Sequence, residues 1–314
     1  MSDLSPNDVL KQIAGSLPSE FRKHVIIVGS LAAAYHFPRE SGERRVATKD
    51  VDFMVVPHAA AVVTAQEVTN RLIDAEWSLR PHDKWGTPGT PEQPTEALPA
   101  VRLQPPDSTA WFLELLGAPD ESRPPRLERE MYRLHTSIGD FALVSFGFLG
   151  LVQHDAVESD YEVRIATPAM MALANLLHHP EVGPQVIEDL PYFGRKLRRA
   201  SKDLGRVVAL ARLGGRAETD TWAERWARAL LSMHPAQAAE LAQRVGAGLQ
   251  DLLSNAEFVA QALYTCNLGL LAGQDLNEAQ FRGTAQVVLA DAIEPLQELV
   301  QRERDSYSHT PPRP

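Results

Sequence analysis

The chain has 314 residues, of which 44% are hydrophobic and 23% charged, so it can bury one large core or two modest ones. This composition excludes a disordered chain, and the single cysteine, Cys266, excludes an internal disulfide. Lys and Arg number 31 against 41 Asp and Glu, which gives a formal charge of −10. That charge argues against a protein that binds nucleic acid over its whole surface, but it is compatible with a local basic site.

The N-terminal residues are polar and acidic, so we expect no secretory signal. The longest apolar stretches, Val25–Tyr35 and Phe141–Val152, are shorter than the roughly 20 residues that a membrane-spanning helix needs. We therefore expect a cytoplasmic protein that does not contact a membrane.

The first part of the chain alternates between helix and strand patterns. A helix is predicted at Ser5–Leu17, with Ser5 as its cap. The β-branched run His24–Val28 predicts a buried strand that ends at Gly29, and a helix is expected at Leu31–Phe37. The next elements are a strand at Asp50–Val56, a helix at Ala59–Ile73 and a short strand at Trp77–Arg80.

Residues 81–125 contain ten of the 23 prolines, so we expect a long proline-rich loop at residues 81–99. Loops of this length often border active sites. Strands are predicted at Ala100–Leu103, Trp111–Leu116 and Tyr161–Ile165, and a hairpin at Met131–His135 and Phe141–Ser145.

Strand patterns nearly vanish after Thr167-Pro168. The expected fold class is therefore α+β: a mixed sheet with helices in residues 1–165, an all-helical domain in 166–305 and a disordered tail in 306–314. The expected helices of the second domain are Met170–His178, Tyr192–Leu213, Thr219–Leu231, Pro235–Leu253, Ala256–Leu271 and Asn277–Arg304.

Three features of the first domain carry chemistry. Gly29-Ser30 joins a strand to a helix, where backbone N–H groups and the serine hydroxyl can bind a phosphate. Asp50 and Asp52 point to the same face of a strand, and two such carboxylates suit Mg²⁺. Glu114 is a lone acid in the apolar strand WFLELL. Taken singly, these features could also be a structural turn, a solvated acid pair and a solvent-facing glutamate.

Taken together, the three features resemble the nucleotidyltransferase superfamily with the DNA polymerase β-like fold. The segments VGSLAAAYH and RVATKDVDFMVV are most similar to the abortive-infection and toxin–antitoxin branch of this superfamily. The resemblance implies that Gly29 and Ser30, with Lys49, bind the nucleotide. It also implies that Asp50, Asp52 and Glu114 bind two Mg²⁺ ions, with Mn²⁺ as an alternative, and that Glu114 could serve as the base.

A basic stretch in the second domain suggests a clamp for phosphate. On the predicted helix Tyr192–Leu213, five basic residues share one face, and an apolar face lies opposite. A triphosphate or an RNA backbone could bind there, and a solvated cationic face is the alternative. The basic residues are Arg195, Arg198, Arg199, Lys202 and Arg206, and we assign Arg195, Arg199 and Lys202 to nucleotide binding.

The second domain departs from the toxin-like relatives at two positions. Lys202-Asp203-Leu204 matches the start of their Lys-Asp-x-x-Asp pattern, but Arg206 stands where the second acid is expected. Asn175 stands where those relatives carry a lysine. Outside this pattern, the adjacent His178 and His179 cannot easily face one metal ion, so we expect them to pack at a helix end.

The leading hypothesis is a Mg²⁺-dependent nucleotidyltransferase that moves a nucleoside monophosphate from an NTP onto a hydroxyl of an RNA end (tRNA-like), a protein or a small molecule. Its partner would be an antitoxin or a second copy of the chain. The main alternative is a non-catalytic nucleotide- or RNA-binding protein of a toxin–antitoxin or defence pair. A third hypothesis is an enzyme of the antibiotic-modifying kind, which acts on a small molecule. The base preference and the acceptor do not follow from the residues.

Overall fold

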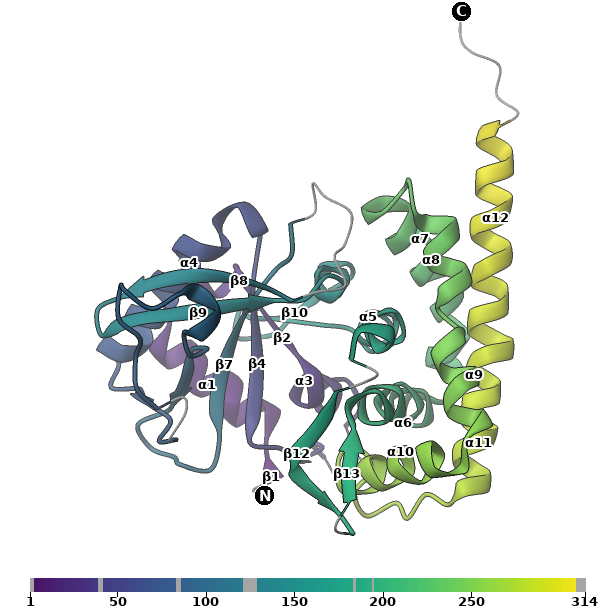
Figure 1. Ribbon diagram of the computed structural model, residues 1–314, viewed down its shortest axis with the longest axis horizontal. Coiled ribbons are helices and arrows are strands. Elements are labelled where there is room, and N and C mark those ends of the chain that lie inside the picture. Colours follow the sequence, from purple (N-terminus) through teal and green to yellow (C-terminus); the bar gives the residue numbers. More distant parts are fainter. Residues whose placement is uncertain are drawn as a thin grey trace, which may run out of the picture. The chain divides into compact units, whose positions relative to one another are not determined.

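A computed structural model describes residues 3–38, 42–82, 86–120, 129–182, 185–193 and 195–308 (Figure 1). Only the backbone is described for residues 180–182, 188–191, 195 and 306–308. The chain divides into two units, Met1–Thr167 and Pro168–Pro314, where the sequence predicts a boundary after residue 165. The first unit is a mixed α/β structure and the second is mainly helical, which confirms the coarse fold class.

A mixed sheet forms the centre of the first unit. In the described residues its main path has the order β10 (Val157–Glu158), β11 (Arg164–Ile165), β2 (Val25–Val28), β4 (Asp50–Val55), β7 (Phe112–Gly117), β6 (Arg102–Gln104) and β5 (Ser78–Leu79). The hairpin of β8 (Glu130–Thr136) and β9 (Gly139–Ser145) joins it through β9, which pairs with β7. The pairs β11–β2, β4–β7 and β7–β9 are parallel, and the other pairs are antiparallel. Thus β4 lies between one antiparallel and one parallel neighbour.

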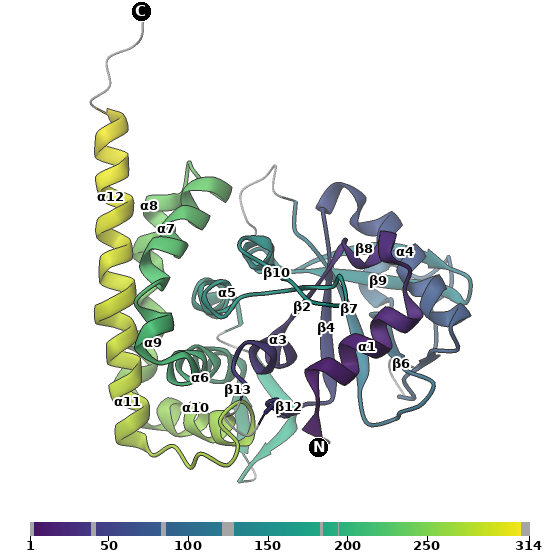
Figure 2. The ribbon, with the colours of Figure 1, turned by 180° about the vertical axis from the view of Figure 1, so that it is seen from behind.

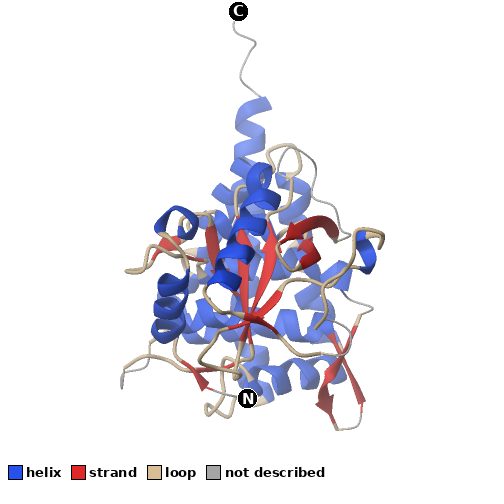
Figure 3. Ribbon diagram, turned by 90° about the vertical axis from the view of Figure 1, so that its left-hand side faces the viewer, coloured by secondary structure: helices blue, strands red, loops and turns tan. Residues whose placement is uncertain are grey.

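Helices pack on this sheet. Helix α3 (Gly29–His36) contacts β2 and β4, and α4 (His58–Asp74) contacts β4, β7 and β8 (Figure 2). Figure 3 shows helices beside the strands of the sheet. Helix α1 (Pro6–Ser16) packs on α3, and the Ser5 hydroxyl accepts from the Asp8 N–H at 3.1 Å, which confirms the predicted cap. The short elements are α2 (Ser19–Arg22), the 3₁₀ turns η1 (Thr95–Ala97) and η2 (Leu149–Gln153), and the pair of β1 (Asp3–Leu4) with β3 (Val46–Ala47).

The central strands are buried because their residues are apolar on both faces. Ile27, Phe53 and Leu115 are each 0% exposed. Full burial of such a side chain stabilises the fold by about 1.5–3 kcal/mol. The acids of β4 and β7 are therefore held on strands with little freedom to move.

The second unit is a helical bundle with one hairpin. Helix α12 packs along α7 and α8 (Figure 1), and Trp226 is fully buried with its Nε1–H donated to the Ala169 carbonyl at 2.7 Å. Among the described residues, no helix is both long and apolar enough to cross a membrane. The helices are α5 (Pro168–Val182), α6 (Arg199–Thr219), α7 (Trp222–Met233), α8 (Ala238–Arg244), α9 (Ala247–Ser254), α10 (Ala256–Leu268), α11 (Glu278–Val287), the π-turn η3 (Val288–Ile293) and α12 (Glu294–Ser308).

Three expectations for this unit are wrong. The predicted helix Tyr192–Leu213 begins only at Arg199, because β12 (Val186–Tyr192) and β13 (Arg195–Arg198) form an antiparallel hairpin before it. The predicted helix Pro235–Leu253 is split into α8 and α9. The expected tail 306–314 is helical at 306–308, because α12 runs to Ser308, and its remaining residues, 309–314, lie outside the described part.

Candidate functional site

The turn between β2 and α3 lies against an acidic side chain. Gly29 opens α3 with a φ of +77°, a conformation that L side chains rarely adopt. A Cβ at this position would lie 2.7 Å from Oδ2 of Asp52, so the space beside the glycine is already taken by the carboxylate. Ser30 follows, half-buried, as the second residue of α3. The turn therefore requires glycine for two reasons. Its φ is positive, and the Asp52 carboxylate occupies the space that a side chain would need.

Strand register brings the three predicted acids to one face of the sheet. Asp52 lies opposite Val28 in the antiparallel pair β2–β4 and opposite Glu114 in the parallel pair β4–β7. Side chains in register share a face, and Asp50 shares it because it lies two residues before Asp52. Asp50 is exposed, whereas Asp52 and Glu114 are half-buried. The first-turn N–H groups of α3 adjoin this acidic edge.

An arginine that the sequence analysis did not assign to the site pairs with Glu114. Arg102 lies opposite Glu114 in the antiparallel pair β6–β7. Its Nε donates to Oε2 at 3.0 Å and its Nη2 to Oε1 at 3.2 Å, so both carboxylate oxygens are engaged. The predicted strand Ala100–Leu103 contains Arg102, but its register against β7 is not visible in the sequence.

The residues just before β4 fix the position of Asp50. The Thr48 hydroxyl, which is buried, donates to Oδ1 of Asp50 at 2.6 Å. The Lys49 carbonyl accepts from the Phe112 N–H at 2.8 Å, which ties this segment to the start of β7. The Lys49 side chain is exposed.

The donor set suits a hard cation at two of the three acids. Two carboxylates on one face, completed by water and phosphate oxygens, are typical of Mg²⁺ sites. Across the described residues, no group of three or more His, Cys, Asp or Glu side chains is placed to hold a metal ion. Glu114 is turned to Arg102 instead. Asp50 and Asp52 therefore fit the cation, and Glu114 could join them only after exchanging its guanidinium partner.

The basic residues predicted to bind phosphate belong to the second unit, and their expected arrangement is wrong. Arg195 lies in β13, with its side chain outside the described residues, and Arg198 precedes α6 as its cap residue. Only the later members are helical: Arg199 is exposed with its Nε 3.6 Å from Asp203, and Lys202 is half-buried in the same turn. The five basic residues therefore do not form one helix face.

The two departures from the toxin-like pattern also lie in this unit. The Asn175 side chain donates to the Met171 carbonyl at 2.8 Å within α5. Arg206 is half-buried on α6, two turns after its start. Neither position carries the lysine or the acid that the resemblance implies.

Comparison of the chain with protein-family models, with curated proteins and with solved structures found no match.

Proposed function

We propose that this protein is a Mg²⁺-dependent nucleotidyltransferase whose first unit has the nucleotidyltransferase-like arrangement. The observation that supports it most is the contact between the Gly29 turn and the Asp52 carboxylate, because it sets a phosphate-binding helix start beside an acidic pair. Transfer would place a nucleoside monophosphate from an NTP on a hydroxyl of an RNA end, a protein or a small molecule. A toxin or defence setting, with an antitoxin or a second copy of the chain as partner, belongs to the same proposal.

The predicted site residues would have distinct roles in this reaction. The N–H groups at the start of α3 and the Ser30 hydroxyl would bind the phosphate chain, with Lys49 as a further cation. Asp50 and Asp52 would hold Mg²⁺, which when bound neutralises phosphate charge and lowers the pKa of a coordinated hydroxyl. Glu114 would act as the base or as a further ligand. Arg195, Arg199 and Lys202 would bind phosphates of the nucleotide or of RNA.

A specific observation favours the second candidate, a non-catalytic nucleotide- or RNA-binding protein. Arg102 engages both oxygens of Glu114, and a carboxylate held in this way is poorly placed to accept a proton or a second cation. The departures at Asn175 and Arg206 point in the same direction. In this candidate the turn at Gly29 binds phosphate, but the protein does not catalyse nucleotidyl transfer.

A turnover assay separates the two candidates. The purified chain is incubated with Mg²⁺ or Mn²⁺, each α-labelled NTP and total RNA, and label is followed on RNA and on the protein, together with pyrophosphate release. The variant is Asp52→Asn. The matched control is Asp74→Asn, because Asp74 is an exposed acid at the C-terminal end of α4, where loss of a negative charge does not harm the helix.

We expect transfer by the wild type and by Asp74→Asn, and a loss of at least about a hundredfold in Asp52→Asn, since removal of one transition-state charge contact commonly has this effect. Pyrophosphate without labelled macromolecule would indicate a small-molecule acceptor. Metal-dependent NTP binding without turnover would support the binding protein, and equal activity in all three proteins would contradict the site.

A further inference from the structure

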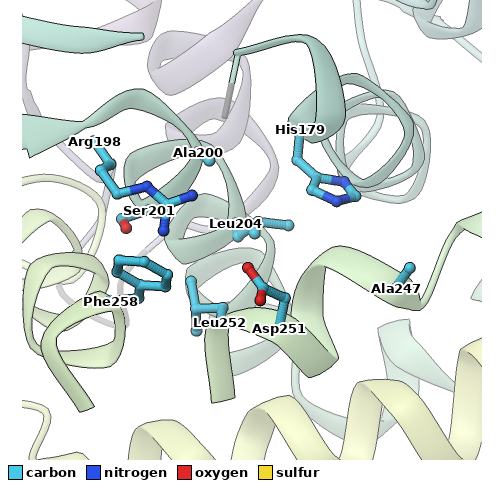
Figure 4. Close-up of a pocket in the computed structure, with 9 residues that line it drawn as sticks. All are labelled: His179, Arg198, Ala200, Ser201, Leu204, Ala247, Asp251, Leu252 and Phe258. Carbon is cyan, nitrogen blue, oxygen red and sulfur yellow. The ribbon is translucent and has the colours of Figure 1, made fainter. Parts of the chain in front are cut away.

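The second unit contains a pocket of about 330 Å³ that the proposed nucleotidyltransferase site does not use. It is lined by residues at the start of α6, near the end of α5, and on α9 and α10 (Figure 4). Arg198 and Ser201 lie on one side and His179 across from them, and the Asp251 carboxylate points toward the space between (Figure 4). Small-molecule sites are typically of this size, with an apolar lining and a few polar groups. Leu204, Leu252 and Phe258 supply the apolar lining here.

Ser201 is a buried donor in the pocket wall that lacks a partner. Ser201 is 1% exposed, and its Oγ makes no hydrogen bond within the described part of the chain. A buried hydroxyl left in this state costs stability, so such groups are normally paired with protein, water or a ligand. Because Ser201 is the third residue of α6, its hydroxyl lies beside the N–H groups of the first helical turn.

The start of α6 is also electrostatically suited to an anion. The cap residue, Arg198, provides no side-chain cap, and the Arg199 N–H donates to the Gln185 carbonyl at 3.0 Å, so the next N–H groups of the first turn are left to other acceptors. The Arg198 guanidinium lies 3.6 Å from the centre of the Phe258 ring, and its backbone N–H donates to the Gln261 side chain at 3.0 Å. Stacking on the ring holds the charge at the pocket wall. Helix N–H groups, a hydroxyl and a guanidinium together form an anion-binding set.

The opposite side of the pocket offers acceptors instead of donors. Nδ1 of His179 donates to the Leu176 carbonyl at 2.6 Å, which leaves Nε2 of the neutral ring as an acceptor. Burial lowers the pKa of His179, which keeps the ring neutral near pH 7. The ring packs so closely on α9 that a Cβ at Gly248 would lie 2.1 Å from Nε2. The Asp251 carboxylate is a second acceptor, so this side suits hydroxyl groups.

We propose that this pocket binds a hydroxylated phosphomonoester, either a sugar phosphate or the sugar-phosphate part of a nucleoside monophosphate. The phosphate contacts Ser201, Arg198 and the start of α6, and the sugar hydroxyls donate to His179 and Asp251. A phosphate is favoured over a carboxylate because a dianion gains more than a monoanion from the Arg198 guanidinium and the positive end of the α6 dipole. All contacts lie within the second unit, so binding does not depend on Asp52.

Calorimetry and thermal unfolding of the full chain test the proposal with four probes: ribose 5-phosphate, AMP, ribose and inorganic phosphate. The variants are Ser201→Ala and Arg198→Met, and the control is Arg212→Met, an exposed arginine further along α6. Ser201→Ala is the sharper variant. Its unpaired hydroxyl contributes little to the ligand-free fold, so its melting temperature should stay unchanged or rise.

We expect ribose 5-phosphate or AMP to bind and raise the melting temperature, and ribose not to bind. Inorganic phosphate should bind at least tenfold more weakly than the better of the two esters. Ser201→Ala and Arg198→Met should each weaken ester binding at least tenfold, whereas Arg212→Met should not. Tighter binding of AMP would identify a nucleotide as the source, and tighter binding of ribose 5-phosphate a sugar phosphate. The proposal is overturned if neither ester binds at millimolar concentration, or if Ser201→Ala binds like the wild type.

Discussion

Arg102 and Glu114 lie directly opposite each other on β6 and β7, and the guanidinium donates to both carboxylate oxygens, at 3.0 Å and 3.2 Å. The two side chains are only 23% and 19% exposed. Half-buried, two-bond pairs of this kind are stronger than surface ion pairs, because water screens them less. This pair therefore supports the acidic edge of the sheet and also competes with any cation for Glu114.

Arg102→Met should destabilise the fold by about 1–3 kcal/mol, because it leaves a half-buried carboxylate without its partner. Urea unfolding measures this loss. Millimolar Mg²⁺ should stabilise the variant more than the wild type, since a cation can then take the place of the guanidinium. The control is Arg102→Met combined with Glu114→Gln. In this double variant both the loss of stability and the additional stabilisation by Mg²⁺ should be smaller. A Mg²⁺ effect equal to that of the wild type would show that Glu114 takes no part in cation binding.

Gly29→Ala should destabilise the protein by about 1–3 kcal/mol, because the substitution adds a strained positive φ and a close contact with Asp52. The matched control is Gly15→Ala in α1, where a Cβ meets nothing within 4 Å and should stabilise the helix by about 0.5–1 kcal/mol. Urea unfolding of both variants should thus give changes of opposite sign. Similar stability in the two variants would show that the turn does not press on the carboxylate.

Much of the first unit could be predicted because its signals are local. The run HVIIV, the alternation around Asp52 and the hairpin pattern gave β2, β4, β8 and β9 to within two residues, and Ser5 was identified as a cap. The period of a strand places Asp50 and Asp52 on one face without knowledge of the fold.

The rest could not be predicted because it depends on pairing between distant segments. The register that sets Arg102 against Glu114 follows from how β6 docks on β7 and leaves no trace in either segment. The spacing of the basic residues indicated a helix, but the pairing of β12 with β13 keeps Arg198 extended until α6 begins. The pocket around Ser201 joins four segments and has no signature in any one of them.

Asp140 should make the stability of the first unit sensitive to acid. It is 5% exposed and accepts from Arg133 and, at 2.9 Å, from Nδ1 of His135. Burial alone would raise the pKa of Asp140, but the hydrogen bonds from His135 and Arg133 outweigh it and lower the pKa below its ordinary value. Because the pKa of Asp140 is lower in the folded state, its carboxylate contributes fully to the free energy of unfolding above the unfolded pKa, about 4. This contribution is lost as the pH falls below that value.

Asp140→Asn should therefore cost about 1–3 kcal/mol at pH 7, and the difference from the wild type should narrow below about pH 4. Urea midpoints measured across this pH range test the expectation, with Asp107→Asn, an exposed acid, as the control. A difference between the wild type and Asp140→Asn that stays constant with pH would mean that Asp140 is not charged in the folded protein.

Cys266 should report on the opening of the second unit. It is the single cysteine of the chain, it is 3% exposed on α10, and its Sγ lies 3.1 Å from the Gly205 carbonyl of α6. Burial raises the pKa of the Cys266 thiol to about 12, so almost no reactive thiolate forms at pH 8. A thiol reagent should therefore label the native chain at least about a hundredfold more slowly than the urea-unfolded chain.

A second variant links this labelling to helix packing. A Cβ at Gly205 would lie 3.0 Å from the Ala262 carbonyl and 3.2 Å from the Thr265 hydroxyl, so Gly205→Ala should push α6 and α10 apart. We expect it to destabilise the unit by about 1–3 kcal/mol and to accelerate Cys266 labelling by about the fivefold to 150-fold that this energy implies. Gly283→Ala on α11, where a Cβ meets nothing within 4 Å, should leave the labelling rate unchanged. Rapid labelling of the wild type would contradict the close contact between α6 and α10.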